Sequence, residues 1–436
     1  MAKKMTISDH SSSQPSAHTQ PVPKYKSNEK QTEELPDGGL QAWATVAGGF
    51  MLYVAGLGYF NAYGVYQDFY VRQFMTRYSP AEIAWIGSCQ IAIQFVLGLP
   101  VGKLFDAGYF HHLMIVGSII YCFSLWALSL AKPNQYYLIF LTQGVGMGIG
   151  LGLTFLPALA VTAHHFSRRR GLAMGIMTSG ASIGGIIFPI MLNNLLFRHG
   201  FAIGVRATAA LITALMLLAN LLIRPRYRKN QPASKASLRI IINDLPYMIF
   251  VAAGVFIMLG IFYPIFYLQL YAIKQGIREK IAFDTITLIN AGGVLGRVIP
   301  NFLADRVGSF NVIIPVIFLA AGCVLAMLAV ALGSGGIIAV SLLYGIMNAG
   351  FVSISPALLA ELSTDRSEIG IRMGLWFSFT AAAAMAGQPL SGALILGNFR
   401  WSTVFAGVCL CVGGSLSILS RLFFLRRRLR DGGAAL

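Results

Sequence analysis

The fold is decided by the stretch Leu288-Ile-Asn-Ala-Gly-Gly-Val-Leu-Gly-Arg297-Val-Ile-Pro300-Asn-Phe-Leu-Ala-Asp305-Arg306-Val-Gly308. It is apolar and rich in glycine, it contains a single arginine before its end, and it runs into an Asp-Arg-x-Gly turn. The residues from Arg297 to Asp305 span roughly 12 Å in a helix. If that helix crosses a bilayer, the guanidinium lies inside the hydrocarbon, where a charge costs about 2.5–3.5 kcal/mol and usually faces a bundle interior or a water-filled path. The stretch therefore predicts a membrane helix whose arginine faces inward.

The composition of the whole chain predicts a polytopic membrane protein. Its 436 residues are 56% hydrophobic and 11% charged, and the mean hydropathy is +0.68. Apolar runs of roughly 20 residues, each long enough to cross a bilayer, recur about twelve times between Trp43 and Leu425. They lack the alternating pattern of a membrane β-barrel, and a helix satisfies its own backbone hydrogen bonds in lipid. We expect an all-α fold with twelve transmembrane helices.

The basic residues indicate how the chain is oriented. The net charge is +17, which by itself could indicate binding to nucleic acid. If the N-terminus is inside, however, most of the 33 Lys and Arg residues fall in the loops on the inner side. The positive-inside rule then places both termini in the cytoplasm. We expect a multi-pass protein of the plasma membrane, with a vacuolar membrane as the alternative, whose partners are the lipid bilayer and a small molecule rather than nucleic acid. The sequence does not identify an accessory protein.

The chain divides into two six-helix halves. We predict a disordered cytoplasmic tail at 1–36, a first bundle at 37–223, a basic linker at 224–243, a second bundle at 244–425 and a short tail at 426–436. Three groups of residues recur at a constant offset of 199 residues and at equivalent helix positions, which indicates duplication. These are Asp106 with Asp305, Pro157-Ala158-Leu159 with Pro356-Ala357-Leu358, and Gly171, Met174 and Gly175 with Gly370, Met373 and Gly374. A parallel repeat of this kind places a substrate site between the halves. At this offset Arg297 matches Gly98, so the two halves differ at the one charge within the membrane.

The loop after the second helix of each half resembles a superfamily motif. Gly102-Lys-Leu-Phe-Asp106-Ala-Gly108 and Asn301-Phe-Leu-Ala-Asp305-Arg306-Val-Gly308 are similar to the Gly-x-x-x-Asp-Arg-x-Gly loop of the major facilitator superfamily. The resemblance implies the major facilitator fold. It also implies that Asp106, Asp305 and Arg306 brace neighbouring helices on the cytoplasmic side and set the balance between inward and outward states. An ordinary turn at a helix end is the alternative for either loop alone.

Two further motifs resemble one family within that superfamily. Asp37-Gly38-Gly39, followed by Trp43, is similar to the first signature of the monocarboxylate porter family in the form of its fungal branch. The segment Phe166-Ser-Arg168-Arg169-Arg170-Gly-Leu-Ala-Met-Gly175 is similar to the second signature. The resemblance implies gating or structural roles for these residues. The alternatives are a turn that starts a helix for 37–39, and a snorkelling positive-inside cluster for 168–170.

The same resemblance bears on Arg297. In family members that carry lactate with a proton, this arginine follows an Asp by four residues and is accompanied by a Lys in the first helix. Here those two positions are Gly293 and Asn61, which argues against proton-coupled lactate transport. The acidic residues and histidines lie in tails, loops or helix ends, so neither a proton relay nor a metal site is expected, and no cofactor is predicted.

Polar and aromatic residues of the first and seventh helices predict a roomy, partly apolar cavity. The candidate substrate-binding residues are Arg297, Asn61, Tyr63, Gln143, Tyr267 and Asn348. For the uncharged members the alternative is a hydrogen bond between helices. For Arg297 it is snorkelling to the cytoplasmic face or a role in helix packing.

The sequence therefore predicts a secondary active transporter that moves an organic anion or a weakly acidic small metabolite by alternating access. An efflux pump for a fungal secondary metabolite is the alternative, and a non-transporting nutrient sensor is a further one. An enzyme is not expected, because no His/Asp or His/Cys cluster lies at the membrane face.

Overall fold

The structure is a computed structural model that describes residues 38–225, 238–328, 333–363, 368–397 and 399–430. The predicted tail at 1–36, Asp37, most of the linker and residues 431–436 lie outside the described residues. Within the described part, twelve helical spans are long and apolar enough to cross a membrane. The prediction of an all-α protein with twelve such helices is confirmed.

Each half contributes six spans. The first half contains α1 (Leu40–Tyr53), η1 (Val54–Gly58), α2 (Tyr63–Phe69), η2 (Tyr70–Phe74), α3 (Pro80–Val96), α4 (Gly98–Asp106), α5 (Phe110–Leu128), α6 (Tyr136–Ile139), η3 (Phe140–Gly146), α7 (Met147–His165), α8 (Arg170–His199) and α9 (Phe201–Leu222), the η elements being π-helical. The second half contains α10 (Leu238–Ile242), α11 (Leu245–Ile261), α12 (Tyr263–Lys274), α13 (Glu279–Val307), α14 (Ser309–Ala326), α15 (Ser334–Leu362), α16 (Ile369–Gly397) and α17 (Phe399–Arg430).

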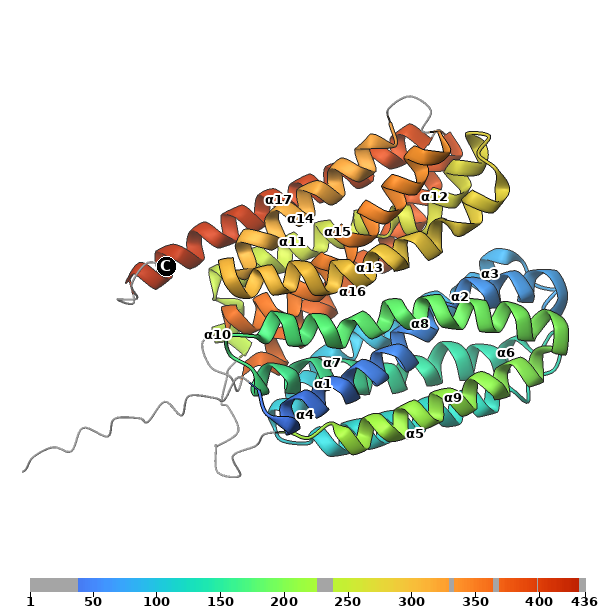
Figure 1. Ribbon diagram of the computed structural model, residues 1–436, viewed down its shortest axis with the longest axis horizontal. Coiled ribbons are helices and arrows are strands. Elements are labelled where there is room, and N and C mark those ends of the chain that lie inside the picture. The colour runs from blue at the N-terminus through green and yellow to red at the C-terminus, as the bar shows by residue number, and fades with distance from the viewer. Residues whose placement is uncertain (1–37, 226–237, 329–332, 364–367, 398, 431–436) are drawn as a thin grey trace, which may run out of the picture. The chain divides into compact units, whose positions relative to one another are not determined.

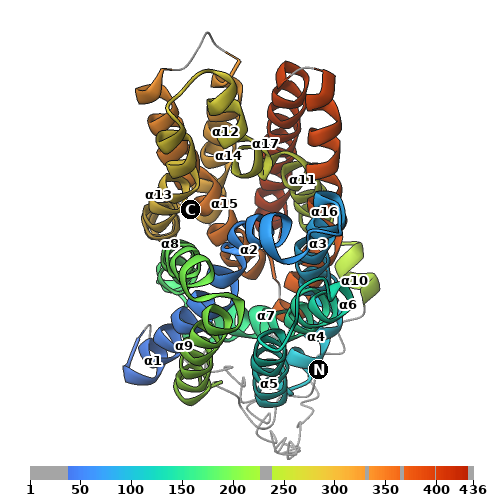
Figure 2. The ribbon, with the colours of Figure 1, turned by 90° about the vertical axis from the view of Figure 1, so that its right-hand side faces the viewer.

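The helices of each half pack together, and the two halves meet mainly along two helix pairs. Figure 1 shows the first half in blue to green and the second in yellow to red, and Figure 2 shows the same grouping end-on. In the first pair, α13 of the second half lies beside α8 of the first. In the second, α16 of the second half lies beside α4 of the first. These pairs are equivalent under the repeat, because α4 matches the end of α13 and α8 matches α16.

Glycines allow these helix pairs to approach closely. A Cβ added at Gly374 would meet the carbonyl of Gly98, and one added at Gly102 would meet the carbonyl of Gly370. In the other pair, a Cβ at Gly175 would meet the carbonyl of Arg297. Small residues let helix backbones pack together in a membrane, where hydrophobic burial gives little driving force between helices. The recurring glycines that indicated duplication therefore lie at the contacts between the halves.

The first and seventh spans are interrupted near their middles. The first passes from α1 through the π-helical η1, and a turn at Asn61 and Ala62 separates it from α2. The seventh breaks at Phe262, between α11 and α12. Single-turn π-helices inside α-helices often occur at functional sites. At both interruptions the regular α-helical hydrogen bonding is broken, and Asn61 and Phe262, which lie there, face the other half.

Candidate functional site

A cavity of about 310 Å³ lies between the two halves. Its walls come from both halves, including the first span, α7 and α8 on one side and α12, α13, α15 and α16 on the other. The lining is dominated by aromatic and aliphatic side chains, among them Phe60, Phe155, Phe262, Phe266 and Phe377. A cavity of this size and lining is typical of sites for organic ligands of drug-like size.

Arg297 is the one charged side chain among the described residues that line this cavity. It projects from α13 and donates from Nη1 to the hydroxyl of Ser182 on α8, which belongs to the other half. It also donates to the carbonyl of Gly293, one turn earlier, over 3.4 Å. Its Nε is buried and has no hydrogen-bond partner among the described residues. The guanidinium therefore connects the two halves and keeps a donor available.

Gly293 explains how the guanidinium and the Ser182 hydroxyl fit together. A Cβ at position 293 would lie 2.6 Å from the Ser182 oxygen and 3.0 Å from Nη1 of Arg297. Glycine leaves that space open, at the position where proton-coupled members of the resembled family carry an Asp. As a result, Nη1 of Arg297 donates here to a neutral hydroxyl and a carbonyl, and a buried guanidinium with neutral partners retains a strong attraction for an anion.

Other polar atoms of the cavity walls are also buried without a hydrogen-bond partner among the described residues. They are the hydroxyl of Tyr53 on α1, the amide oxygen of Asn348 on α15 and Nε1 of Trp376 on α16. Buried polar groups are normally paired, and an unpaired one in a native structure often marks a place where water or a ligand binds. Together with the Nε of Arg297, the residues that line the cavity contribute three unpaired donors and one unpaired acceptor.

Two asparagines, one from each half, approach the same glycine on α8. A Cβ at Gly185 would lie 2.8 Å from the amide oxygen of Asn290 and 2.9 Å from the amide nitrogen of Asn61. Asn61 donates to the carbonyl of Ala181 over 3.3 Å, and Asn290 donates to that of Ile286 over 3.1 Å. The two amide side chains add uncharged polar groups to the cavity wall. Their close approach to α8 requires that position 185 has no side chain.

Four of the six predicted substrate-binding residues line the cavity, namely Arg297, Asn61, Tyr63 and Asn348. Gln143 and Tyr267 are not among the residues that line it. Gln143 lies within η3, where its amide oxygen accepts a hydrogen bond of 2.6 Å from the buried hydroxyl of Tyr70. Tyr267 packs against Tyr263 of the same helix, with 5.6 Å between ring centroids. Gln143 thus faces η2, and the Tyr267 hydroxyl lies 2.7 Å from the place that a Cβ at Gly392 on α16 would take.

Sequence reasoning left Tyr53 and Ser182 unnoticed and did not select Asn290 for the site. Each comes from a helix with many polar or aromatic residues, and helical spacing alone does not say which face turns toward the other half. The offset of 199 residues marks the helix of Ser182 through Gly171 and Gly175, but only the structure shows that this helix packs against α13, which carries Arg297.

The carboxylates of Asp106 and Asp305 join the halves at one end of the bundle, which we call the latch end. Asp106, at the end of α4, accepts hydrogen bonds from the backbone N–H groups of Gly370 and Ile371 at 3.1 and 2.7 Å. Asp305, near the end of α13, accepts them from Gly171 and Leu172, both at 2.7 Å. Each carboxylate thus binds the N-terminus of a helix in the opposite half, where free N–H groups and the helix dipole favour a negative charge.

The remaining motif residues lie around the latch end. Arg168 and Arg169 are exposed in the turn before α8, whereas Arg170 begins that helix and donates to the carbonyl of Phe166 over 3.4 Å. The guanidinium of Arg306 lies over the ring of Phe302, 4.2 Å from its centroid.

The two signature segments meet at an aromatic contact near the start of α1. Gly38 and Gly39 precede that helix with φ of +147° and +102°, a backbone region that favours glycine. The chain then places Trp43 edge-on against Phe166, with 5.3 Å between ring centroids. The two segments are therefore packed against each other, whereas Asp37 lies outside the described residues.

Within the described residues, no group of three or more His, Cys, Asp or Glu side chains is placed to hold a metal ion. The described residues that line the cavity supply one cation, several neutral polar groups and an aromatic wall, which are groups that bind an organic ligand. At the latch end, the contacts of Asp106 and Asp305 hold the two halves together.

Comparison with known proteins identifies relatives over most of the chain. The family model of the Major Facilitator Superfamily matches residues 44–363. "MFS-type transporter 1" of Ophiocordyceps sp. is 34% identical over 393 residues, covering 89% of this chain and 87% of the relative. The Aspyridones efflux protein apdF of Emericella nidulans is 34% identical, covering 90% and 80%. The Agnestins efflux protein AgnL12 of Paecilomyces divaricatus is 35% identical, covering 88% of each.

Solved structures show the same fold. The E. coli fucose:proton symporter superposes with a TM-score of 0.69 at 18% sequence identity, covering 87% of this chain and 98% of that one. A bacterial homologue of the iron transporter ferroportin, in an outward-facing state, also gives a TM-score of 0.69, at 13% identity and with 87% and 99% coverage.

Proposed function

This chain belongs to the Major Facilitator Superfamily of membrane transporters, and from that premise we propose that it exports a weakly acidic, largely apolar organic metabolite by alternating access. Relatives that align over most of their length are named as efflux proteins, and they favour the export alternative over uptake of a carboxylate. We assign the chain to the monocarboxylate-porter-like branch on the two signature segments that meet at Trp43 and Phe166.

The observation that carries the proposal is Arg297 in its aromatic cavity. Among the described residues, the cavity wall supplies a single cation and no carboxylate, and the Nε of that cation lacks a partner. An acidic oxygen of the substrate would complete the guanidinium with a charge-assisted hydrogen bond, which is about twice as strong as a neutral one. The substrate therefore carries the negative charge that the protein lacks at this point.

The other residues of the cavity wall indicate the size and polarity of the remainder of the substrate. Phe60, Phe262 and Phe266 present apolar surface, which favours a ring system or an aliphatic chain over a short acid such as lactate. The unpaired amide oxygen of Asn348 accepts a hydrogen bond, so it suits a hydroxyl of the substrate, and the Tyr53 hydroxyl suits a second oxygen. An aromatic acid or an acidic enol with further hydroxyl groups fits this pattern.

The contacts of Asp106 and Asp305 indicate which state of the transport cycle the structure represents. We take the latch end as cytoplasmic because the basic residues of the chain gather there. We propose that both termini are then inside and that the protein acts in the plasma membrane, with the vacuolar membrane as the alternative. Asp106 and Asp305 then close the cytoplasmic side, and the cavity extends from Arg297 toward Gln67 and Phe266 near the outer ends of their spans. In this arrangement a bound metabolite is released outward, and opening of the latches readmits substrate from the cytoplasm.

The test compares metabolite export by wild-type protein and by Arg297→Ala and Arg297→Lys in a strain that lacks the gene. Loss of a hydrogen bond to a charged group costs about 1.5–3 kcal/mol, so roughly a ten- to hundredfold loss of export is expected for Arg297→Ala. Export is measured as the ratio of extracellular to intracellular amounts of each acidic metabolite by mass spectrometry.

The matched control is Arg428→Gln. This residue is half exposed and pairs with Glu361 over 3.5 Å, far in sequence from the cavity lining, and its loss should leave export unchanged. The Lys variant keeps the charge but loses the fixed geometry of the guanidinium, so partial export is expected. Full export of acidic metabolites by a folded Arg297→Ala variant would contradict the proposal.

A further inference from the structure

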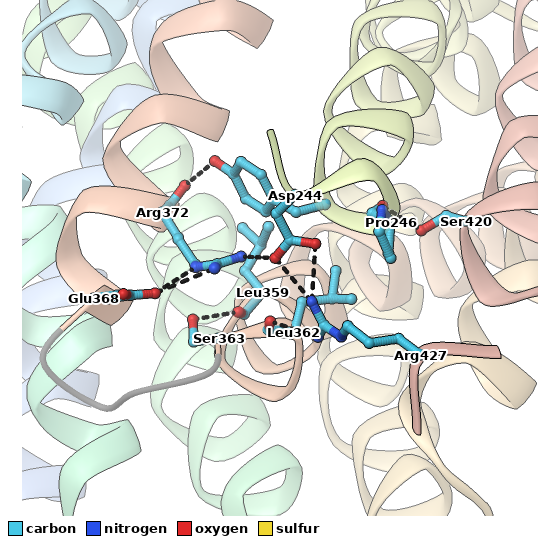
Figure 3. A network of polar contacts seen from close by, with 10 residues as sticks. Asp244, Pro246, Leu359, Leu362, Ser363, Glu368, Arg372, Ser420 and Arg427 are labelled. Carbon is cyan, nitrogen blue, oxygen red and sulfur yellow. Dashed lines mark hydrogen bonds and ion pairs between the residues drawn. The ribbon is translucent and has the colours of Figure 1, made fainter. Parts of the chain in front are cut away.

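A buried ion network lies behind one of the two latches. Figure 3 shows Asp244, which precedes α11, between two arginines from different helices. Its Oδ2 accepts from Nη1 of Arg372 on α16 at 2.6 Å. Both of its carboxylate oxygens accept from Nη1 of Arg427 on α17, at 2.8 and 2.9 Å. Arg372 also pairs with Glu368 at 3.1 Å, so two carboxylates and two guanidinium groups form one connected cluster.

The cluster joins the latch-end termini of four helices in the second half. Asp244 holds the start of α11, and Glu368 and Arg372 hold the start of α16 (Figure 3). Arg427 holds the last part of α17 and donates from Nη2 to the carbonyl of Leu362, the last residue of α15, over 3.3 Å. The backbone carbonyl of Arg372 in addition accepts a hydrogen bond of 2.7 Å from the hydroxyl of Tyr247 on α11.

Burial makes this arrangement rigid. The side chains of Arg372 and Asp244 are 2% and 8% exposed. Breaking a buried ion pair by removing one partner leaves an unpaired charge in a site of low dielectric, which is strongly unfavourable. Arg372 is therefore held at two places: its guanidinium binds Asp244, the residue before α11, and its backbone carbonyl binds Tyr247 on α11.

Arg372 lies next to the N–H groups that bind Asp106. Those groups belong to Gly370 and Ile371, the two residues before it in the first turn of α16. The position of that turn decides whether both N–H groups point at the carboxylate. A cluster that holds Arg372 from two sides thus also holds the surface on which the Asp106 latch closes.

The other latch has no such cluster at the equivalent positions. Under the repeat, Arg372 corresponds to Ala173 and Asp244 to Thr45. Ala173 is buried and carries no charge. The Thr45 hydroxyl accepts a hydrogen bond from the backbone N–H of Arg224 over 3.3 Å instead of binding α8. The two residues of the cluster that adjoin the Asp106 latch, Asp244 and Arg372, are thus replaced by uncharged residues at the equivalent positions of the first half.

We propose that Arg372 is a positioning residue for the cytoplasmic gate, which acts through Asp244 and Tyr247 to hold the first turn of α16 where it binds Asp106. Loss of this support weakens the closed latch and shifts the carrier toward the state in which the latch end is open. The proposal rests on the alternating-access transport of the superfamily and not on the identity of the substrate.

The experiment measures the separation of the halves at the latch end by pulsed electron paramagnetic resonance. Spin labels are placed at His112 and Asn311, which are exposed and occupy the third positions of α5 and α14, in a background in which the five native cysteines are replaced. Arg372→Gln is expected to raise the ratio of long to short distances by at least about fivefold, as a coupling between sites of ordinary size would. Arg372→Lys should give a smaller rise.

Two further variants keep the test decisive. Arg428→Gln removes an exposed arginine at the same end of the bundle and is expected to leave the distances unchanged. Tyr247→Phe removes only the hydroxyl that holds the Arg372 carbonyl, and it tests the same link if Arg372→Gln does not fold. A rise in the long distances for Tyr247→Phe supports the proposal. Wild-type distances in the folded Arg372→Gln and Tyr247→Phe variants would overturn it, whatever the substrate proves to be.

Discussion

The two interfaces between the halves are built to one plan and differ where the substrate site lies. In each, an aspartate binds the N-terminus of a helix in the opposite half, and glycines let the paired helices touch. At the position where α4 has Gly98 against Gly374, however, α13 has Arg297 against Gly175. Both interfaces therefore keep a close backbone contact at this position, and the α8–α13 interface in addition holds a charged side chain that lines the cavity. The duplication supplies a symmetric gate, and the departure from symmetry supplies the proposed site.

The buried charges outside the cavity are distributed the other way round: the interface without Arg297 has the buried ion pairs near its latch. The pair with the arginine in the membrane has three arginines in or next to its latch helix at Arg168, Arg169 and Arg170, two of them exposed. The pair without a charge in the membrane has the buried cluster around Asp244 and Arg372. Exposed charges are screened and contribute little, whereas buried ones hold geometry. We therefore expect the α4–α16 interface to be the stiffer one.

The largest expected effect comes from filling the close contacts. Valine at Gly175 places a Cβ on the carbonyl of Arg297, and valine at Gly374 places one on the carbonyl of Gly98. Overpacking of this kind typically costs about 1–3 kcal/mol, and at a helix contact it forces the halves apart, so each variant should lose roughly five- to hundredfold in export. Gly322→Val is the control, because nothing lies within 4 Å of a Cβ there. Normal export by either interface variant would mean that the contact is not needed.

Next in size is the loss of charge at the latches. Asp106→Asn and Asp305→Asn each leave one amide oxygen to serve two N–H groups, and we expect about 1.5 kcal/mol of lost stabilisation and roughly a tenfold shift toward the open latch end. The distances between labels at His112 and Asn311 report this shift. Because the two latches lie on different helix pairs, the double variant should show the sum of the two free energies. A double variant no worse than either single one would show that the latches act as a unit.

A carboxylate restored beside Arg297 should compete with the substrate. In Gly293→Asp the new side chain enters the space between the Ser182 hydroxyl and Nη1 of Arg297, where it neutralises the guanidinium. We expect export of acidic metabolites to fall by roughly tenfold, the size of one charge-assisted hydrogen bond. Gly293→Asn has nearly the same shape without the charge and should lose less. Equal losses in the two variants would assign the effect to crowding.

The smallest effect is expected for the hydroxyl that connects Arg297 to the other half. Ser182→Ala removes the hydrogen bond that the charged guanidinium donates from Nη1 to an uncharged hydroxyl. We expect about 1.5 kcal/mol for it, the lower end for a bond with one charged partner, and so a change of up to roughly tenfold in substrate affinity. The change should be toward tighter binding if the hydroxyl competes with the substrate and toward weaker binding if it orients the guanidinium. Ser179→Ala is the control, since that hydroxyl bonds within its own helix to the Ile176 carbonyl over 2.6 Å. Unchanged affinity in Ser182→Ala would assign this hydrogen bond to helix packing alone.

Hydropathy and spacing predicted much of the fold, because a bilayer accepts few backbone structures. Apolar runs of this length must be helices, and the recurrence of Asp106 at Asp305 revealed the repeat. The candidate site was harder to predict. Arg297 could be found as a charge in an apolar run, and Asn61 by its place in the resembled family. Gln143 looked like an equally good candidate, yet it lies against Tyr70, since hydropathy does not say which face of an apolar helix is turned to the other half.

The sequence by itself determined that this chain spans a membrane with twelve helices in two related halves, and that one arginine lies within the apolar layer. Only the tertiary structure decided what that arginine contacts, because Ser182 lies 115 residues away in the chain and on the opposite half. It alone also showed that Asp106 and Asp305 bind helix N-termini across the interface, and that Arg372 stands behind one of them. Helix formation in lipid follows from local composition, whereas the partners of a buried charge follow from how separate helices pack.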